Sequence, residues 1–215
     1  DNSSDIRSDS MVRELDRDLY DQDGIILDQI GASAAGQLPK GFDPSSLYPA
    51  RQHPRALQMT IFGMGDALGQ LGVDWKVIQE KIAPDEVAVF SGAAIGQLDS
   101  FGFGGLMQSR SKGSRASSKN LALGLVEMSA DFINAYILGS VGRTGHVVGA
   151  CATFLYNLQM GKEAIESGSA RFVVVGGAEA PITPEIVDGF YAMSALSDDK
   201  RMMEMQAQHN ENLKE

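Results

Sequence analysis

The stretch His146–Gly177, HVVGACATFLYNLQMGKEAIESGSARFVVVGG, decides the fold of this chain. Its first residues, 146–150, predict a short strand, and Phe154–Gly168 predicts a helix from the near-helical spacing of its apolar residues. The run Ala170–Gly177 predicts a second strand, whose unbroken apolar character is typical of a central strand covered on both faces. Strand, helix and strand in succession predict an α/β fold, a mainly parallel sheet with helices on both faces.

Cys151, the single cysteine of the chain, stands between the first strand and the helix of this stretch. A lone thiol cannot form an intramolecular disulfide or a cysteine metal cluster. The thiolate is the reactive form, and the start of a helix stabilises it through backbone N–H groups and the helix dipole. A free cysteine is also often a small buried hydrophobe, so position alone leaves a nucleophile and an inert thiol equally open.

Upstream of this stretch the sequence predicts further elements of the same fold class. Apolar spacing predicts helices at Ala56–Leu71 and Trp75–Ile82, and Glu86–Gly92 predicts a buried strand. Residues 92–120 are rich in glycine and serine and predict a long loop, and Ser129–Leu138 predicts another helix.

Composition excludes several classes of function. The formal net charge of −10 argues against nucleic acid as a partner, and no apolar stretch approaches the ~18 residues that a membrane span needs. The three histidines lack ligand spacing to one another, so neither a metal nor another cofactor is expected. The first residues show no signal-peptide pattern, and one cysteine suits a reducing compartment, so the expected location is the cytoplasm.

Six sequence blocks follow one another along residues 35–197. They are GFDP at 41–44, VAVFSG at 87–92, GFGGL at 102–106, GACAT at 149–153, VVVGGAEA at 173–180 and GFYAMSALS at 189–197. In order and spacing these blocks resemble the N-terminal half of a β-ketoacyl-[acyl-carrier-protein] synthase, a family with the thiolase fold. The resemblance divides the chain into a polar arm at 1–34, the half-domain at 35–197, and a polar tail at 198–215 that is either truncated or helical.

The resemblance implies a mechanism in which Cys151 is the catalytic nucleophile. In that family the cysteine takes an acyl group from a thioester, and the carbanion formed by decarboxylation of malonyl-ACP attacks it in a Claisen condensation. The backbone N–H of Cys151 would be one oxyanion donor. The family's catalytic histidines and lysine come from a C-terminal half that has no match here, and none of His53, His146 and His209 matches them. The chain is therefore expected to be an incomplete fragment that carries the nucleophile alone.

Phe154 stands where the family commonly has a small residue. With SVG at 140–142 and FGGLMQSR at 103–110, this pattern is similar to the FabY branch, which is implicated in condensing an acetyl primer from acetyl-CoA with malonyl-ACP. The resemblance implies substrate binding by Phe154, Ile186 and Phe190, with a short acyl pocket. The alternative for Phe154 is simple packing in the core.

The partners implied by the resemblance are the acyl carrier protein, malonyl and acyl thioesters, and a second copy of the chain. In these synthases the strand before the cysteine pairs with its copy, so a homodimer through 146–150 is expected. Arg51 and Arg55 match two carrier-protein docking positions. They are alternatively solvated surface, and the basic stretch 110–119 could dock the carrier instead.

Three other functions remain open at this stage. One is another thiolase-fold enzyme, such as a thiolase or a chain-length-factor-like subunit. The second is a non-catalytic half or interaction subunit, which the missing histidines favour. The third is an unrelated α/β domain with an inert thiol, which the VVVGGAEA block at 173–180 opposes.

Overall fold

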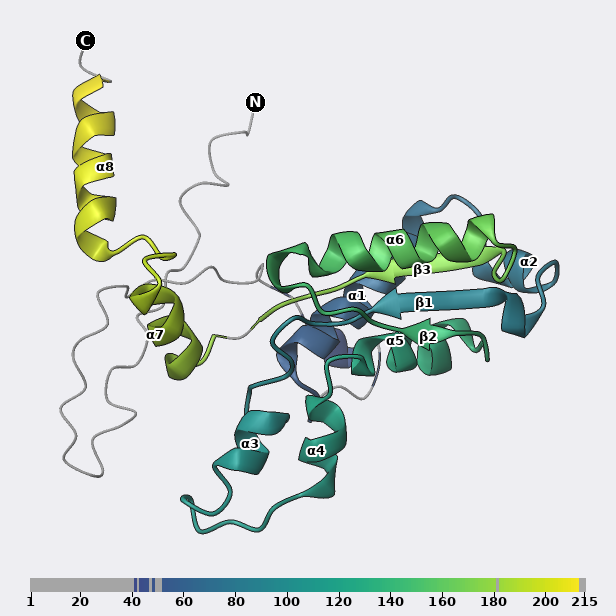
Figure 1. Cartoon of the computed structure of the whole chain (residues 1–215), viewed down its shortest axis with the longest axis horizontal. Helices are drawn as coiled ribbons and strands as arrows, with labels where there is room; N and C mark the ends of the chain where they lie inside the picture. The colour runs from purple at the N-terminus through teal and green to yellow at the C-terminus, as the bar shows by residue number, and fades with distance from the viewer. Residues whose placement is uncertain (1–40, 42, 47, 49–51, 181, 213–215) are drawn as a thin grey trace. The chain divides into compact units, whose positions relative to one another are not determined.

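The computed structural model describes residues 41, 43–46, 48, 52–180 and 182–212. The chain divides into two compact units, one formed by 43–181 and the other by 1–42 with 182–215 (Figure 1). The predicted polar arm at 1–34 lies outside the described residues.

The 43–181 unit is built on a three-stranded parallel sheet in the order β2-β1-β3. The central strand β1 (Val87–Ser91) pairs with β3 (Phe172–Gly176) along its whole length and with β2 (Thr144–Gly145) at two positions. The predicted parallel α/β architecture is therefore confirmed. The run 170–177 is covered on both faces as predicted, but among the described strands the central, fully buried one is β1, and β3 lies half-buried at one side.

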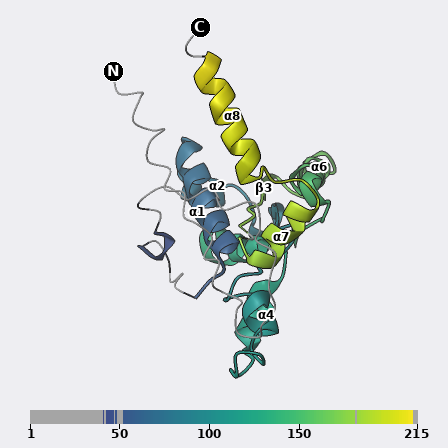
Figure 2. The ribbon, with the colours of Figure 1, turned by 90° about the vertical axis from the view of Figure 1, so that its left-hand side faces the viewer.

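Helices cover both faces of this sheet. Val87, Val89 and Val174 turn to one face, where they pack with residues of α1 (Arg55–Gln70), α5 (Met128–Phe132) and the π-helix η3 (Ile133–Leu138). Ala88, Phe90 and Val173 turn to the other face, where they pack against α6 (Thr153–Glu166). Figure 2 shows α1 and α6 on opposite sides of the unit. The alternation follows from the two-residue period of a strand.

Most predicted helices have a counterpart. The helix predicted at 56–71 corresponds to α1, that at 75–82 to the shorter α2 (Trp75–Gln79), and that at 129–138 to α5 with η3. Two further helices interrupt the predicted loop at 92–120, namely α3 (Phe103–Met107) and the start of α4 (Ser118–Gly124). Glycine has a low helix propensity, but α3 needs it: a Cβ at Gly104 would lie 2.0 Å from the Leu98 carbonyl oxygen.

The strand predicted at 146–150 is also displaced, since the ladder of β2 ends at Gly145. The backbone N–H of Val147 donates to the Asn157 side chain, at 2.9 Å, instead of to a neighbouring strand. The side chain of a downstream helix thus replaces the sheet ladder directly before the candidate nucleophile.

The described part of the second unit consists of α7 (Pro184–Ala192) and α8 (Asp199–Asn212), and the predicted domain limit at residue 197 falls between them. Among the residues that the structure describes, no single helix is long and apolar enough to cross a membrane. The consecutive segments Ser118–Gly124 and Met128–Leu138 reach that length and composition only together, with a 96° bend between them.

Candidate active site

Cys151 lies in a tight turn between β2 and α6. The turn contains the short 3-10 helix η4 (Ala150–Ala152), closed by a 2.9 Å hydrogen bond from the Ala152 N–H to the Gly149 carbonyl, and it runs directly into α6. The thiol of Cys151 is free and exposed. It is therefore accessible to a substrate and lies at the positive end of a 14-residue helix.

The backbone of this turn is strained and is braced by a side chain of α6. Ala150 has a φ of 49°, a left-handed conformation that costs a residue with a Cβ about 1–2 kcal/mol. The buried Thr153 hydroxyl accepts a hydrogen bond from the Gly149 N–H at 3.0 Å and donates one to the Ala150 carbonyl at 2.7 Å. The backbone N–H of Cys151 donates to no acceptor within the described residues.

The turn is located where the strands of the sheet end, and loops from neighbouring strands meet there. After β3, the Glu179 carboxylate accepts hydrogen bonds from the N–H groups of Ala94 and Ile95, which follow β1. After β2, a ring nitrogen of His146 lies 2.9 Å from the Ala93 carbonyl oxygen. The carboxyl ends of parallel strands are the usual place for ligands in open α/β sheets, so the location agrees with a reactive role for the turn.

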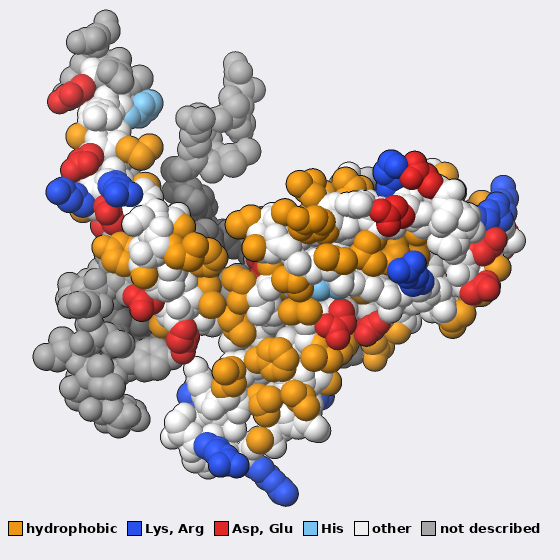
Figure 3. Space-filling model, viewed as in Figure 1, with side chains coloured by type: hydrophobic (Ala, Val, Ile, Leu, Met, Phe, Trp, Pro, Cys, Tyr) orange, Lys and Arg blue, Asp and Glu red, His pale blue; other side chains and the backbone are white. Residues whose placement is uncertain are grey.

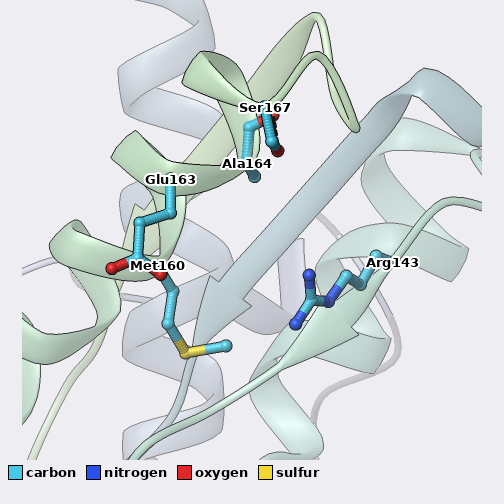
Figure 4. A pocket seen from close by; sticks show the side chains of 5 residues that line it. All are labelled: Arg143, Met160, Glu163, Ala164 and Ser167. Carbon is cyan, nitrogen blue, oxygen red and sulfur yellow. Dashed lines mark hydrogen bonds between the residues drawn. The ribbon is translucent and has the colours of Figure 1, made fainter.

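A cavity of about 260 Å³ lies between α6 and the start of β2, lined by Arg143, Met160, Glu163, Ala164 and Ser167 (Figure 4). Its helical residues belong to the C-terminal half of α6, whereas Cys151 precedes the first turn of that helix. The cavity is therefore separate from the nucleophile turn.

The family model described as "Beta-ketoacyl synthase, N-terminal domain" matches residues 6–210. The chain belongs to the β-ketoacyl synthase family. This membership excludes the alternative of an unrelated α/β domain.

Two curated relatives are similar to this chain. It is 58% identical over 167 residues to the β-ketoacyl-[acyl-carrier-protein] synthase FabY of Pseudomonas aeruginosa, covering 78% of this chain and 26% of the relative. It is 32% identical over 148 residues to 3-oxoacyl-[acyl-carrier-protein] synthase 2 of Staphylococcus aureus, covering 69% and 36%. The predicted likeness to the FabY branch is thereby confirmed.

The crystal structure of the noncanonical ketosynthase FabY from P. aeruginosa superposes with a TM-score of 0.77 at 56% identity, over 81% of this chain and 28% of that one. A β-ketoacyl synthase from Burkholderia phymatum gives 0.64 at 22% identity, over 86% and 43%, which supports the fold alone. This chain thus spans about a quarter to a third of the length of the curated relatives it matches.

The predicted substrate residues are divided between the two units of the chain. Phe154 lies in the first turn of α6, next to the Cys151 turn, and is 51% exposed within the 43–181 unit. Ile186 and Phe190 are half-buried residues of α7, which belongs to the other unit. Of the three predicted residues, Phe154 is therefore the one in the same unit as Cys151.

The predicted docking arginines are described only in part. Arg51 lies outside the described residues. Arg55 is the exposed first residue of α1, and its backbone N–H donates to the Asp99 carboxylate at 2.7 Å. Its use for a carrier protein stays a prediction.

Two ionisable residues near α1, His53 and Tyr48, lie against aromatic rings. His53 packs edge-on against Phe132 and near the ring of Tyr48, where burial, and secondarily the charge of Lys119, lowers its pKa. Burial raises the pKa of Tyr48 to about 12, which keeps its phenol protonated. No group of three or more histidine, cysteine, aspartate or glutamate residues in the described part of the chain could hold a metal.

The sequence predicts Cys151 as the nucleophile but does not predict the side chains that hold its turn. No motif marks Thr153 or Asn157 for this role, and His146 matches no catalytic histidine of the family. The available signal was periodicity, because Thr153 and Asn157 are polar residues four apart in a helix that must turn one face to the sheet.

Proposed function

We propose that this chain supplies the nucleophile of a β-ketoacyl-ACP synthase of fatty acid biosynthesis. The observation that carries the proposal is the exposed Cys151 at the opening of α6, at the carboxyl end of the parallel sheet, in a member of this family. The first step would be acyl transfer to the Cys151 sulfur. The second would be a Claisen condensation with malonyl-ACP.

In the first step the Cys151 thiolate attacks the carbonyl carbon of an acyl thioester. A new carbon–sulfur bond forms, the carbon–sulfur bond of the donor breaks, and the donor thiolate leaves and takes a proton from water. The backbone N–H of Cys151, which has no other acceptor within the described residues, supports this step as a donor to the oxyanion.

In the second step the malonyl thioester loses carbon dioxide, and its carbanion attacks the acyl carbon. A carbon–carbon bond forms and the Cys151 thiolate is released. This step needs groups that stabilise the carbanion, and His53, His146 and His209 match none of the family's catalytic histidines. We therefore expect the 215-residue chain to acylate weakly at most and not to condense, and detectable condensation by the pure chain would refute this.

A short primer, such as the acetyl group of acetyl-CoA, is the proposed acyl substrate. The likeness to FabY supports it, as does the bulky Phe154 in the first turn of α6 next to the nucleophile. Phe154→Gly should broaden the range of acyl chain lengths that are transferred, and an unchanged chain-length profile would count against this role. The proposed substrate residues on α7 remain Ile186 and Phe190.

The proposed carrier is the acyl carrier protein, docked on basic side chains. Arg55 is exposed, and the 110–119 stretch contributes four more exposed cations, namely Arg110, Lys112, Arg115 and Lys119. Residues 100–126 contain no aspartate or glutamate although the chain as a whole is acidic, so this stretch is locally positive and suits an acidic partner. Arg51 is retained as a docking candidate from the resemblance alone.

A homodimer through 146–150 is the proposed assembly. Large apolar side chains are exposed on either side of this segment and along the start of α6: Val141, Val147, Val148, Phe154, Leu155 and Leu158. Figure 3 shows hydrophobic side chains gathered on this face of the unit. Exposed apolar clusters of this kind mark association surfaces. The proposed compartment is the cytoplasm, where a single reduced cysteine would persist.

The test is the intact mass of the pure chain after incubation with acetyl-CoA. A gain of one acetyl group that is lost in Cys151→Ala supports the proposal. No acetylation of a folded chain whose Cys151 still reacts with iodoacetamide favours the alternative, a non-catalytic thiolase-fold half or interaction subunit.

A further inference from the structure

A series of three side-chain hydrogen bonds joins α6 to the ends of β2 and β1. The Val147 N–H lies 2.9 Å from Asn157 Oδ1, and Asn157 Nδ2 lies 3.0 Å from His146 Nδ1. The other ring nitrogen of His146, Nε2, lies 2.9 Å from the carbonyl oxygen of Ala93. Asn157 is fully buried, and His146 is partly buried.

The backbone groups at the two ends of this hydrogen-bond series fix the donor and the acceptor of every bond in it. A backbone N–H can only donate, so the Asn157 oxygen faces Val147 and its NH₂ group faces the imidazole. His146 Nδ1 must then accept. A carbonyl oxygen can only accept, so Nε2 carries the proton and donates to Ala93. All three hydrogen bonds form only when His146 is neutral and in the Nε2–H tautomer.

The ring of His146 is also held by packing. A Cβ built on Gly92 would lie 2.4 Å from the imidazole Cγ, so the ring lies directly against the backbone that follows β1. His146 and Asn157 therefore bracket the ten residues between them, and Cys151 lies near the middle of that segment. Both ends of the bracket are fixed to elements outside the turn, the end of β1 and the body of α6.

We propose that His146 and Asn157 are positioning residues that set the orientation of the Cys151 turn for acyl transfer. The inference rests on the proposed reaction at Cys151 and adds two residues to it. Neither residue touches the acyl group. They act by fixing the backbone from which the Cys151 sulfur and its N–H project, and misplacement by about 1 Å can reduce a reaction rate about 100-fold.

The identity of Asn157 supports a positioning role over simple packing. Asparagine is a poor residue for a helix interior, and burying its amide is costly unless it is hydrogen-bonded. A leucine would suit the apolar face of α6 better if packing were its only task. Here both the oxygen and the NH₂ group of the Asn157 amide form hydrogen bonds with the segment that leads to Cys151.

The experiment compares acylation with alkylation in the full chain. His146→Leu and Asn157→Leu should each lower the rate of acetyl transfer from acetyl-CoA to Cys151 about tenfold or more, with folding checked by circular dichroism. His146→Gln offers one amide donor and one carbonyl acceptor to the same partners and should recover most of that loss. Gln159→Leu, the same kind of change on the exposed side of α6, is the matched control.

Two further measurements keep the result decisive. If the leucine variants do not fold, His146→Asn can still reach Asn157 but not Ala93, and it should acylate more slowly than His146→Gln. A long-range proton–nitrogen spectrum of the unmodified chain should show that the neutral ring of His146 carries its proton on Nε2.

The positioning role is overturned if folded leucine variants acylate at the original rate, if His146→Asn equals His146→Gln, or if His146 is protonated on Nδ1. Failure of the proposed function gives a different result, in which the original chain is alkylated by iodoacetamide but never acetylated. Alkylation rates of the same variants then still test the positioning.

Discussion

Thr153→Val should loosen the turn that carries Cys151 while leaving the packing of α6 nearly unchanged. Valine matches the shape of threonine but lacks the hydroxyl that accepts from the Gly149 N–H at 3.0 Å and donates to the Ala150 carbonyl at 2.7 Å. Both bonds are therefore lost, and the left-handed Ala150 loses the side chain that braces it.

The expected cost follows from the exposure of the two partners. An intramolecular hydrogen bond contributes about 0.5–1.5 kcal/mol, and an unsatisfied buried group costs more. Ala150 is exposed, so water replaces its bond, whereas Gly149 is only half-exposed. The free energy of unfolding should therefore fall by about 1–2 kcal/mol, which lowers the Tm of a chain of this size by about 2–8 °C.

The matched control is Thr153→Ser, which keeps the hydroxyl and removes one methyl group worth about 0.8 kcal/mol. Urea titration gives the stability of both variants, and mass spectrometry gives the rate at which iodoacetamide alkylates Cys151. The valine variant should lose more stability than the serine variant, and it alone should change the alkylation rate. Equal stability and equal alkylation in the two variants would refute the bracing role of the hydroxyl.

Three further substitutions test the surroundings of this turn. Ala150→Val should destabilise the chain by about 1–3 kcal/mol in urea titration, because a β-branched residue is strained at a φ of 49°. The stability of Ala150→Gly should stay within about 1 kcal/mol of the original. A valine variant more stable than the glycine variant would contradict strain at this position. Gly161→Ala should lower the free energy of unfolding by about 1–2 kcal/mol although alanine favours helices, because the new Cβ would lie 2.7 Å from Val175 Cγ2. In the control Gly65→Ala the new Cβ meets nothing within 4 Å, and the free energy of unfolding should rise by up to about 1 kcal/mol. Equal effects of the two substitutions would argue against close packing of α6 on β3. Burial lowers the pKa of His53, so the unfolded chain binds the proton more tightly than the folded chain. The stability that His53 contributes is therefore present above the ordinary histidine pKa and is lost as the pH falls below it. In urea titrations at several pH values, His53→Gln should reduce this loss of stability at acid pH, and an unchanged dependence on pH would exclude His53 as its source.

The sequence predicts the fold class well because the deciding signals are local. An apolar run, a helix with near-helical spacing and a second apolar run are enough to predict a parallel sheet with helices on both faces. Which strand is central is not a local property. The runs at 87–91 and 172–176 are equally apolar, and pairing on both sides makes β1 the central one of the described strands.

The sequence predicts the place of Cys151 for the same reason, but it cannot predict what holds the turn. The Thr153 hydroxyl bonds residues only three and four positions away, but other bonds near the turn join residues that are remote in sequence, such as His146 with Ala93 and Glu179 with Ala94. Their hydrogen bonds depend on the register between strands, which the sequence does not reveal. The sequence does not predict the α3 helix for a related reason: its glycines are required by close backbone contacts with residues 97–100.

The inner face of α6 explains how the segment between a short strand and Cys151 is held in place. The ladder of β2 ends at Gly145, so the sheet alone does not fix the residues that lead to Cys151. The buried residues of α6 are Thr153, Asn157, Gly161 and Ala164, which follow one another at helical spacing along a single face.

The polar half of that face binds the segment before Cys151, and the small half packs on the sheet. The helix that follows the nucleophile thus fixes both the turn and its own position on the sheet. It follows that Gly161→Ala, which lifts the far end of this face, should also slow acylation of Cys151, while Gly65→Ala on α1 should not. Loss of stability without any change in acylation by Gly161→Ala would show that the two halves of the face act independently.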